Sequence, residues 1–205
     1  MHVANIDYAH FFEPAFPGRD ACRAFVDCVE NIPAASSKAK IVIHQAAPML
    51  WLGDRMDEVA RGRPALQLLF HLIAAEAVAK IVSNFQDDGQ SRGHVRLFFE
   101  QICGQRHRDV LGAAFRRVPG GPALSIREAV DFLYDVRCDV VHEGVYFGLT
   151  LARPGDATQW LTPSGTGPLI PSVSIQDIRQ IVLEGSVLGA VKLLPPGSPC
   201  AQLVI

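Results

Sequence analysis

Arg137 and His142 are the two residues whose types and spacing best suit acid–base chemistry beside an anion. A histidine side chain titrates near neutral pH, so it can give or accept a proton. A guanidinium offers charged N–H donors in a plane and can hold two oxygens of one phosphate or carboxylate. Such a pair could move protons at a reacting group while the arginine stabilises the negative charge that develops there.

One predicted helix, from Ser125 to Gly144, must position both residues. Ser125 and Glu128 form the pattern of a capping box, and Gly144 suits the left-handed conformation just past a helix end. At about 100° per residue, Arg137 falls in the middle of one apolar stripe. The stripe contains Ile126, Val130, Leu133, Tyr134, Val140 and Val141.

Arg137 must find an acceptor outside its own helix, because its neighbours three and four positions away are apolar. An unpaired buried charge is costly, so another helix, another subunit or a ligand must supply the partner. Glu76 is a candidate from an earlier helix, although it could simply pair with Lys80 four residues on. In the purely structural interpretation, Glu76 holds Arg137 and His142 interacts with the carbonyls at the helix end.

The order of residues around Arg137 resembles the Arg-x4-6-His signature of the HEPN superfamily, and of its Apea-like subgroup in particular. Three segments carry the resemblance besides the signature: Leu72–Ala77, Leu133–Arg137 and Ile175–Leu194. The similar region covers roughly residues 64–194. That family often places a polar residue directly after the arginine, whereas this chain has Cys138 there.

The resemblance implies a helical domain that forms a homodimer and acts as a metal-independent endoribonuclease, as toxins and phage-defence effectors of the family do. Arg137 would stabilise the scissile phosphate and His142 would transfer protons, leaving a 2′,3′-cyclic phosphate. Glu76, Tyr134 and Asp139 would support them. The resemblance implies no metal and no cofactor, and it allows an antitoxin protein as partner. The alternative is a noncatalytic module that dimerises or binds RNA or a nucleotide.

The spacing of the two candidate catalytic residues raises a geometric requirement. Five residues of ideal helix separate two side chains by about 140° around the axis. Arg137 and His142 therefore converge only if the helix bends near Val141, or if a partner subunit contributes to the site.

Composition predicts one domain without a strong overall attraction to nucleic acid. The chain has 205 residues, 49% of them hydrophobic, and a net charge of −2. RNA contact would therefore need a local basic patch. Arg106, His107 and Arg108, together with Arg116 and Arg117, form the densest basic cluster, although such a cluster is often only a solvated loop surface.

The five cysteines show no Cys-x-x-Cys pair, and no signal peptide precedes them. We therefore expect reduced thiols and a cytoplasmic protein. The apolar run near residues 65–75 is interrupted by His71, Glu76 and Lys80, which argues against a membrane span. We expect His44, His71 and His94 to be structural, with no metal site.

The fold class that these patterns predict is mostly α, a HEPN-like antiparallel helical bundle within a single domain, 1–205. N-terminal helices in 18–61 should pack on a core at about 64–194. A small β-hairpin is expected near 145–161, and the tail 197–205 is expected to be loose or docked at an edge. Expected helices are 18–31, 36–47, 50–61, 64–85, 91–103, 106–115, 125–144 and 174–194.

Overall fold

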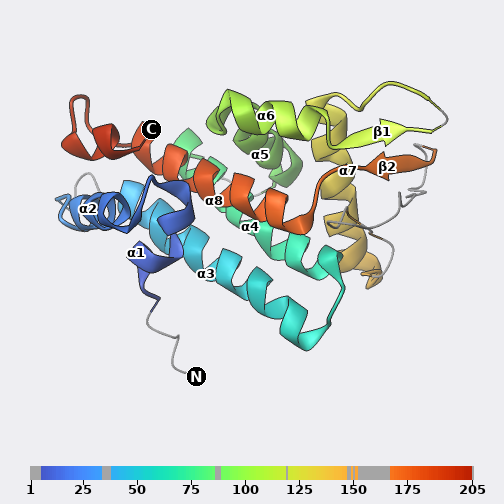
Figure 1. The fold of residues 1–205 in the computed structure, drawn as a ribbon, viewed down its shortest axis with the longest axis horizontal. Helices are drawn as coiled ribbons and strands as arrows, with labels where there is room; N and C mark the ends of the chain where they lie inside the picture. The colour runs from blue at the N-terminus through green and yellow to red at the C-terminus, as the bar shows by residue number, and fades with distance from the viewer. Residues whose placement is uncertain are drawn as a thin grey trace.

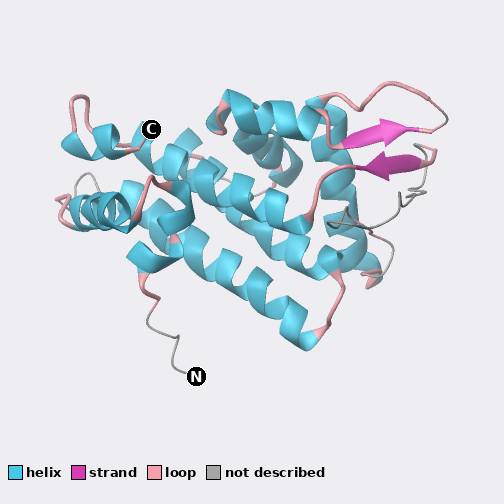
Figure 2. Ribbon diagram, viewed as in Figure 1, coloured by secondary structure: helices cyan, strands magenta, loops and turns pink. Residues whose placement is uncertain are grey.

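Three long helices lie side by side through the centre of the molecule (Figure 1). They are α3 (Lys38–Val59), α4 (Pro64–Ser83) and α8 (Ile175–Lys192). Figure 2 shows that the rest of the fold is also mostly helical. The computed structural model describes residues 6–33, 38–85, 89–118, 120–146, 149, 151 and 167–204.

The shorter elements surround this three-helix centre. At one end lie α1 (Tyr8–Phe11) and α2 (Arg19–Glu30), with 3₁₀ turns at Glu13–Ala15 and Pro199–Leu203. Elsewhere lie α5 (Ser91–Leu97), a π-helical turn at Phe98–Ile102, α6 (Gln105–Gly112), α7 (Ile126–Cys138) and a second π-helical turn at Asp139–Glu143. One hydrophobic core draws residues from Phe12 to Cys200.

The predicted capping box at Ser125 is confirmed, and a second capping box begins α8 at Ser174. Ser125 accepts from the backbone N–H of Glu128 while the Glu128 carboxylate accepts from the backbone of Ser125, and Ser174 does the same with Asp177. Gly144 ends the helical segment with φ of 66°, in the left-handed region. The segment is not one regular α-helix, however, because its last turn is π-helical and has i→i+5 hydrogen bonds.

The two helices expected at 36–47 and 50–61 are one helix, because α3 continues through Pro48. Proline inside a helix removes one hydrogen bond and costs about 3 kcal/mol. Packing of α3 along both α4 and α8 offsets that cost. Residues Ala39, Val42, Ala46, Ala47 and Leu50, on both sides of the proline, are fully buried.

A small antiparallel sheet is present, but not where the sequence indicated. It pairs β1 (Phe115–Arg117) with β2 (Leu169–Pro171), in the register Arg116 opposite Ile170. The predicted hairpin near 145–161 falls largely outside the described residues, and the described residues in it form no strand. The helix expected to reach Phe115 ends at Gly112, because the chain there enters β1.

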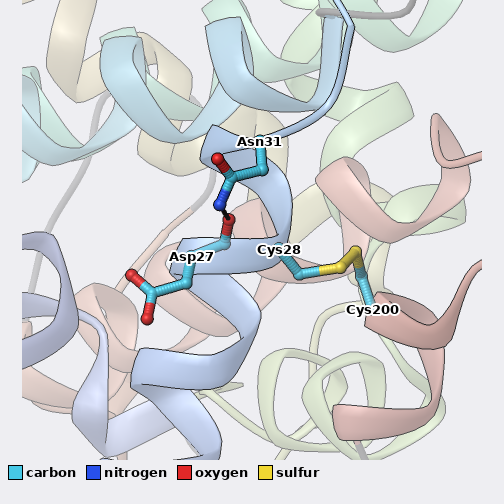
Figure 3. The surroundings of a disulfide bond; sticks show 4 residues. All are labelled: Asp27, Cys28, Asn31 and Cys200. Atoms are coloured by element: carbon cyan, nitrogen blue, oxygen red, sulfur yellow. Dashed lines mark hydrogen bonds between the residues drawn. A yellow bond between two sulfur atoms is a disulfide. The ribbon is translucent and has the colours of Figure 1, made fainter.

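A disulfide between Cys28 and Cys200 overturns the expectation of reduced thiols for these two residues. Figure 3 shows the bond joining α2 to the C-terminal 3₁₀ turn, close to Asn31, whose side chain donates to the Asp27 carbonyl. The two cysteines are 172 residues apart in sequence, and helix packing brings their Cα atoms to 5.8 Å. Spacing alone could not reveal such a pairing.

By length and composition alone, α4 could cross a membrane, with a mean hydropathy of 1.7 over its most apolar window. More than half of that window is buried inside the protein. Such burial is typical of the central helix of a domain, because its apolar side chains contact α3 and α8.

Candidate functional site

Arg137 lies where α4, α5 and α7 meet. Its guanidinium Nη2 is 3.8 Å from Glu76 Oε2, and its guanidinium carbon lies 5.4 Å from the ring centre of Tyr134. The Arg137 side chain is 19% exposed and that of Glu76 12% exposed, so neither group is sealed from solvent. The structure thus brings together three of the residues singled out from the sequence, each in the same chain.

The Glu76 carboxylate has closer partners than Arg137. Ser91 donates from Oγ to Oε1 at 2.7 Å, and Lys80 Nζ lies 2.9 Å from the same oxygen. Burial alone would raise the pKa of Glu76, but the hydrogen bonds from Lys80 and Ser91 and the charge of Arg137 hold it below its ordinary value. Glu76 is therefore ionised at neutral pH and can only accept hydrogen bonds.

A second guanidinium lies over Tyr134. The guanidinium carbon of Arg92 is 4.8 Å from the ring centre, and Arg92 also pairs with Asp135. Burial raises the pKa of the Tyr134 phenol, which keeps it protonated at neutral pH. Tyr134 thus lies near two cations, which is favourable because the ring face is electron-rich.

Arg137 differs from the other shielded arginines in that its N–H groups make no hydrogen bonds with the described residues. Arg179, 17% exposed, donates to both carboxylate oxygens of Asp54 at 2.6 and 2.8 Å. Arg96 holds Asp131 in the same two-bond geometry. Arg137 forms an ion pair with Glu76 at 3.8 Å, but within the described ranges it makes no hydrogen bond, because that distance is too long for one. Its five N–H donors are available to an anion.

His142 lies on the exposed side of the second π-helical turn, and so does Asp139. In the part of the chain that the structure describes, neither side chain is hydrogen bonded or ion paired. In a π-helical turn each residue advances less around the axis than in an α-helix. The rotation from Arg137 to His142 is therefore smaller than in an ideal helix, but no hydrogen bond or ion pair among the described residues joins the two side chains.

Val141, placed on the buried stripe by its spacing, is instead 49% exposed. The regular rotation of 100° per residue assumed for the stripe does not continue past Cys138, where the π-helical turn starts. The four stripe residues within α7 itself are buried or partly buried, as expected.

The predicted RNA-binding cluster does not form a common surface. His107 is 7% exposed, and its Nε2 is hydrogen bonded to Glu184. This hydrogen bond is the main reason that the pKa of Glu184 is lowered. Arg108 donates to the Cys103 carbonyl at 2.8 Å and to Gln105. Only Arg106 of the three is exposed.

Ser91 and Arg92 are site residues that sequence reasoning missed. Ser91 is the first residue of α5, where a serine is ordinarily explained as a cap, yet it bonds to Glu76, fifteen residues earlier. Nothing in the local pattern indicates such a partner, because the contact depends on how α5 folds back on α4.

Comparison with known protein families, with curated proteins and with solved structures finds no match for this chain.

Proposed function

We propose that this protein is an RNA-binding domain that cleaves RNA without a metal ion, in the manner of the HEPN superfamily it resembles. The observation that supports this is the state of Arg137: a shielded guanidinium, open to solvent on one side, without a hydrogen bond in the described residues. A phosphodiester is an anion, and a planar guanidinium can bind two of its oxygens.

In the proposed reaction, the ribose 2′-hydroxyl attacks the adjacent phosphorus. A base takes the hydroxyl proton, the P–O5′ bond breaks, and an acid protonates the departing 5′-oxygen, which leaves a 2′,3′-cyclic phosphate. Arg137 stabilises the charge on the pentacoordinate phosphorus. His142 serves as base or acid, and in a homodimer the partner subunit's His142 supplies the second group.

The test is cleavage of RNA in excess EDTA by the wild-type protein, Arg137→Ala and His142→Ala, with cyclic-phosphate ends scored on the products. Removing an essential acid or base typically costs 10²- to 10⁴-fold in rate, so we expect about that loss for His142→Ala. His10→Ala, which removes another exposed histidine, should keep the wild-type rate. Equal background cleavage by all four proteins would refute the proposal.

A noncatalytic RNA- or nucleotide-binding module is the second candidate, and one observation favours it. Arg137 forms an ion pair with a carboxylate, Glu76, within the same chain, so that its charge has a partner without a second subunit. This candidate predicts that RNA binds in an Arg137-dependent manner but stays intact. Binding and cleavage measured on the same RNA distinguish the two.

A further inference from the structure

The two carboxylate oxygens of Glu76 have different surroundings. Oε1 has both close partners, Ser91 at 2.7 Å and Lys80 at 2.9 Å. Among the described residues, Oε2 takes part in one ion pair, with Arg137 Nη2 at 3.8 Å, and in no hydrogen bond. Oε2 therefore keeps its capacity to accept a hydrogen bond, beside a guanidinium that keeps its capacity to donate.

Glu76 Oε2 can accept a hydrogen bond and the Arg137 guanidinium can donate hydrogen bonds. Together they restrict the kinds of ligand that can bind at this site. A phosphate oxygen can only accept, so a phosphate alone would suit Arg137 but would be repelled by Glu76. The ligand that matches both groups presents an O–H donor beside an anionic oxygen. Ribose in an RNA strand does so, because its 2′-hydroxyl lies next to the 3′-phosphate, whereas DNA lacks the hydroxyl.

The neighbours of Glu76 are suited to keeping Oε2 in place for such a ligand. Lys80 lies on α4 one turn after Glu76, and Ser91 begins α5, so the carboxylate is held from two helices. Oε1 thus carries the two shorter contacts, and Oε2 is the oxygen that lies nearer to Arg137, at 3.8 Å from Nη2.

We propose that Glu76 and Arg137 together select RNA over DNA: Oε2 accepts a hydrogen bond from a ribose 2′-hydroxyl, while the Arg137 guanidinium donates to the adjoining phosphate. This inference rests on the proposed function, since it takes the site to bind an RNA backbone. It concerns the bound ground state alone, in which the hydroxyl proton lies toward Glu76. In the enzyme the base takes this proton when the hydroxyl attacks, and in the noncatalytic module the hydroxyl keeps it.

The experiment measures affinity with His142→Ala protein, so that cleavage does not remove the probe. Three short single-stranded probes of one sequence are compared: RNA, 2′-fluoro RNA and DNA. The 2′-fluoro probe keeps the sugar shape of RNA but has no O–H donor. A hydrogen bond to a charged group contributes roughly 1.5–3 kcal/mol, so RNA should bind about tenfold or more tightly than either other probe.

Glu76→Gln tests the free oxygen without changing the shape of the side chain. A carboxamide has one oxygen, which Lys80 and Ser91 should hold, leaving its NH₂ group toward Arg137. We expect the ratio of RNA to 2′-fluoro affinity to fall to about one. Glu58→Gln, a substitution at an exposed carboxylate on α3, should leave the ratio unchanged. Thermal unfolding of each variant checks that the fold is kept.

Arg137→Met separates this inference from the function on which it rests. If the site binds RNA, this variant weakens all three probes. Loss of affinity in Arg137→Met together with an unchanged RNA preference in Glu76→Gln overturns the selection by Glu76 but leaves the proposed function standing. So does a wild-type site that binds RNA and 2′-fluoro RNA equally. Binding that does not depend on Arg137 overturns the proposed function.

Discussion

His71 is fully buried, and neither of its ring nitrogens has a hydrogen-bond partner among the described residues. The histidine packs against Gly53, where an added Cβ would lie 2.7 Å from its Nε2. Burial, with a smaller effect of the Arg179 charge, lowers the pKa of His71 to about 3. The sequence predicted a structural histidine, and its location agrees with that prediction.

This buried histidine makes stability depend on pH. The folded state keeps His71 neutral, whereas the unfolded chain binds a proton as the pH falls below about 6.5. Stability is therefore highest above pH 6.5 and is lost between pH 6.5 and 3, by about 2 kcal/mol at pH 5. Urea unfolding at pH 7.5 and pH 5 measures the difference for wild type and for His71→Leu.

In His71→Leu the difference between the two pH values should be about 2 kcal/mol smaller than in wild type. The same substitution at the exposed His10 should leave the difference unchanged. An identical pH dependence in wild type and His71→Leu would show that His71 does not titrate as described.

The sequence could predict those features of the site that depend on residue type alone. Arg137 on an apolar face requires a partner, and Glu76 is the carboxylate that the structure places beside it. The pairing of Glu76 with Lys80 also follows from their spacing, whereas the bond from Ser91 to the same oxygen could not be predicted. That depends on the angle between α4 and α5, which no local pattern records.

At the scale of elements, α8 approaches α4 closely at Gly189. A Cβ added there would lie 2.7 Å from Val78 Cγ1, closer than real Cβ atoms come to a neighbour. Gly189→Ala should therefore destabilise the protein by about 1–3 kcal/mol, although alanine is by itself the better helix former.

Gly93→Ala on α5 is the matched control, because the nearest atom to its added Cβ is 4.0 Å away. It should raise the free energy of unfolding by up to about 1 kcal/mol. Chemical denaturation of both variants gives the comparison. If Gly189→Ala were as stable as wild type, α8 would have room to move away from α4.

Helix starts were predictable and some helix interiors were not. Ser125 and Ser174 begin helices, and each forms side-chain hydrogen bonds with the residue three positions later. This pattern is local, so it can be recognised in the sequence. The π-helical turn after Cys138 and the continuation of α3 through Pro48 depend on packing against distant elements. The pairing of β1 with β2 is also between segments far apart in sequence.

At the scale of the whole molecule, the Cys28–Cys200 disulfide should contribute strongly to stability. A bond across 172 residues removes much of the conformational freedom of the unfolded chain, worth about 5 kcal/mol by the loop-entropy relation. Reductant should lower the midpoint of thermal unfolding of the wild-type protein, and should have no effect on Cys28→Ala/Cys200→Ala.

Cys138→Ser, which removes a free and partly exposed thiol, should respond to reductant as wild type does. Equal melting temperatures of wild type with and without reductant would show that the bond is absent or unimportant. Disulfides are rare in the reducing cytoplasm, so trapping the thiols in intact cells also tests the cytoplasmic location expected from the sequence.

The proposed ribonuclease should be harmful to a cell that produces it without a regulator. Induced expression is expected to stop growth and to leave cyclic-phosphate ends on cellular RNA. His142→Ala should relieve the arrest at equal protein level, whereas His10→Ala should not. Arrest of equal strength with His142→Ala would exclude RNA cleavage by His142 as its cause.

The disulfide also makes a closed covalent ring of everything between Cys28 and Cys200. A protease that cuts the backbone once inside this ring yields two fragments that remain one molecule until the bond is reduced. Nicked protein should therefore migrate as a single species on a gel without reductant and separate into two with it. Fragments from limited proteolysis of this protein should therefore be analysed on gels both with and without reductant.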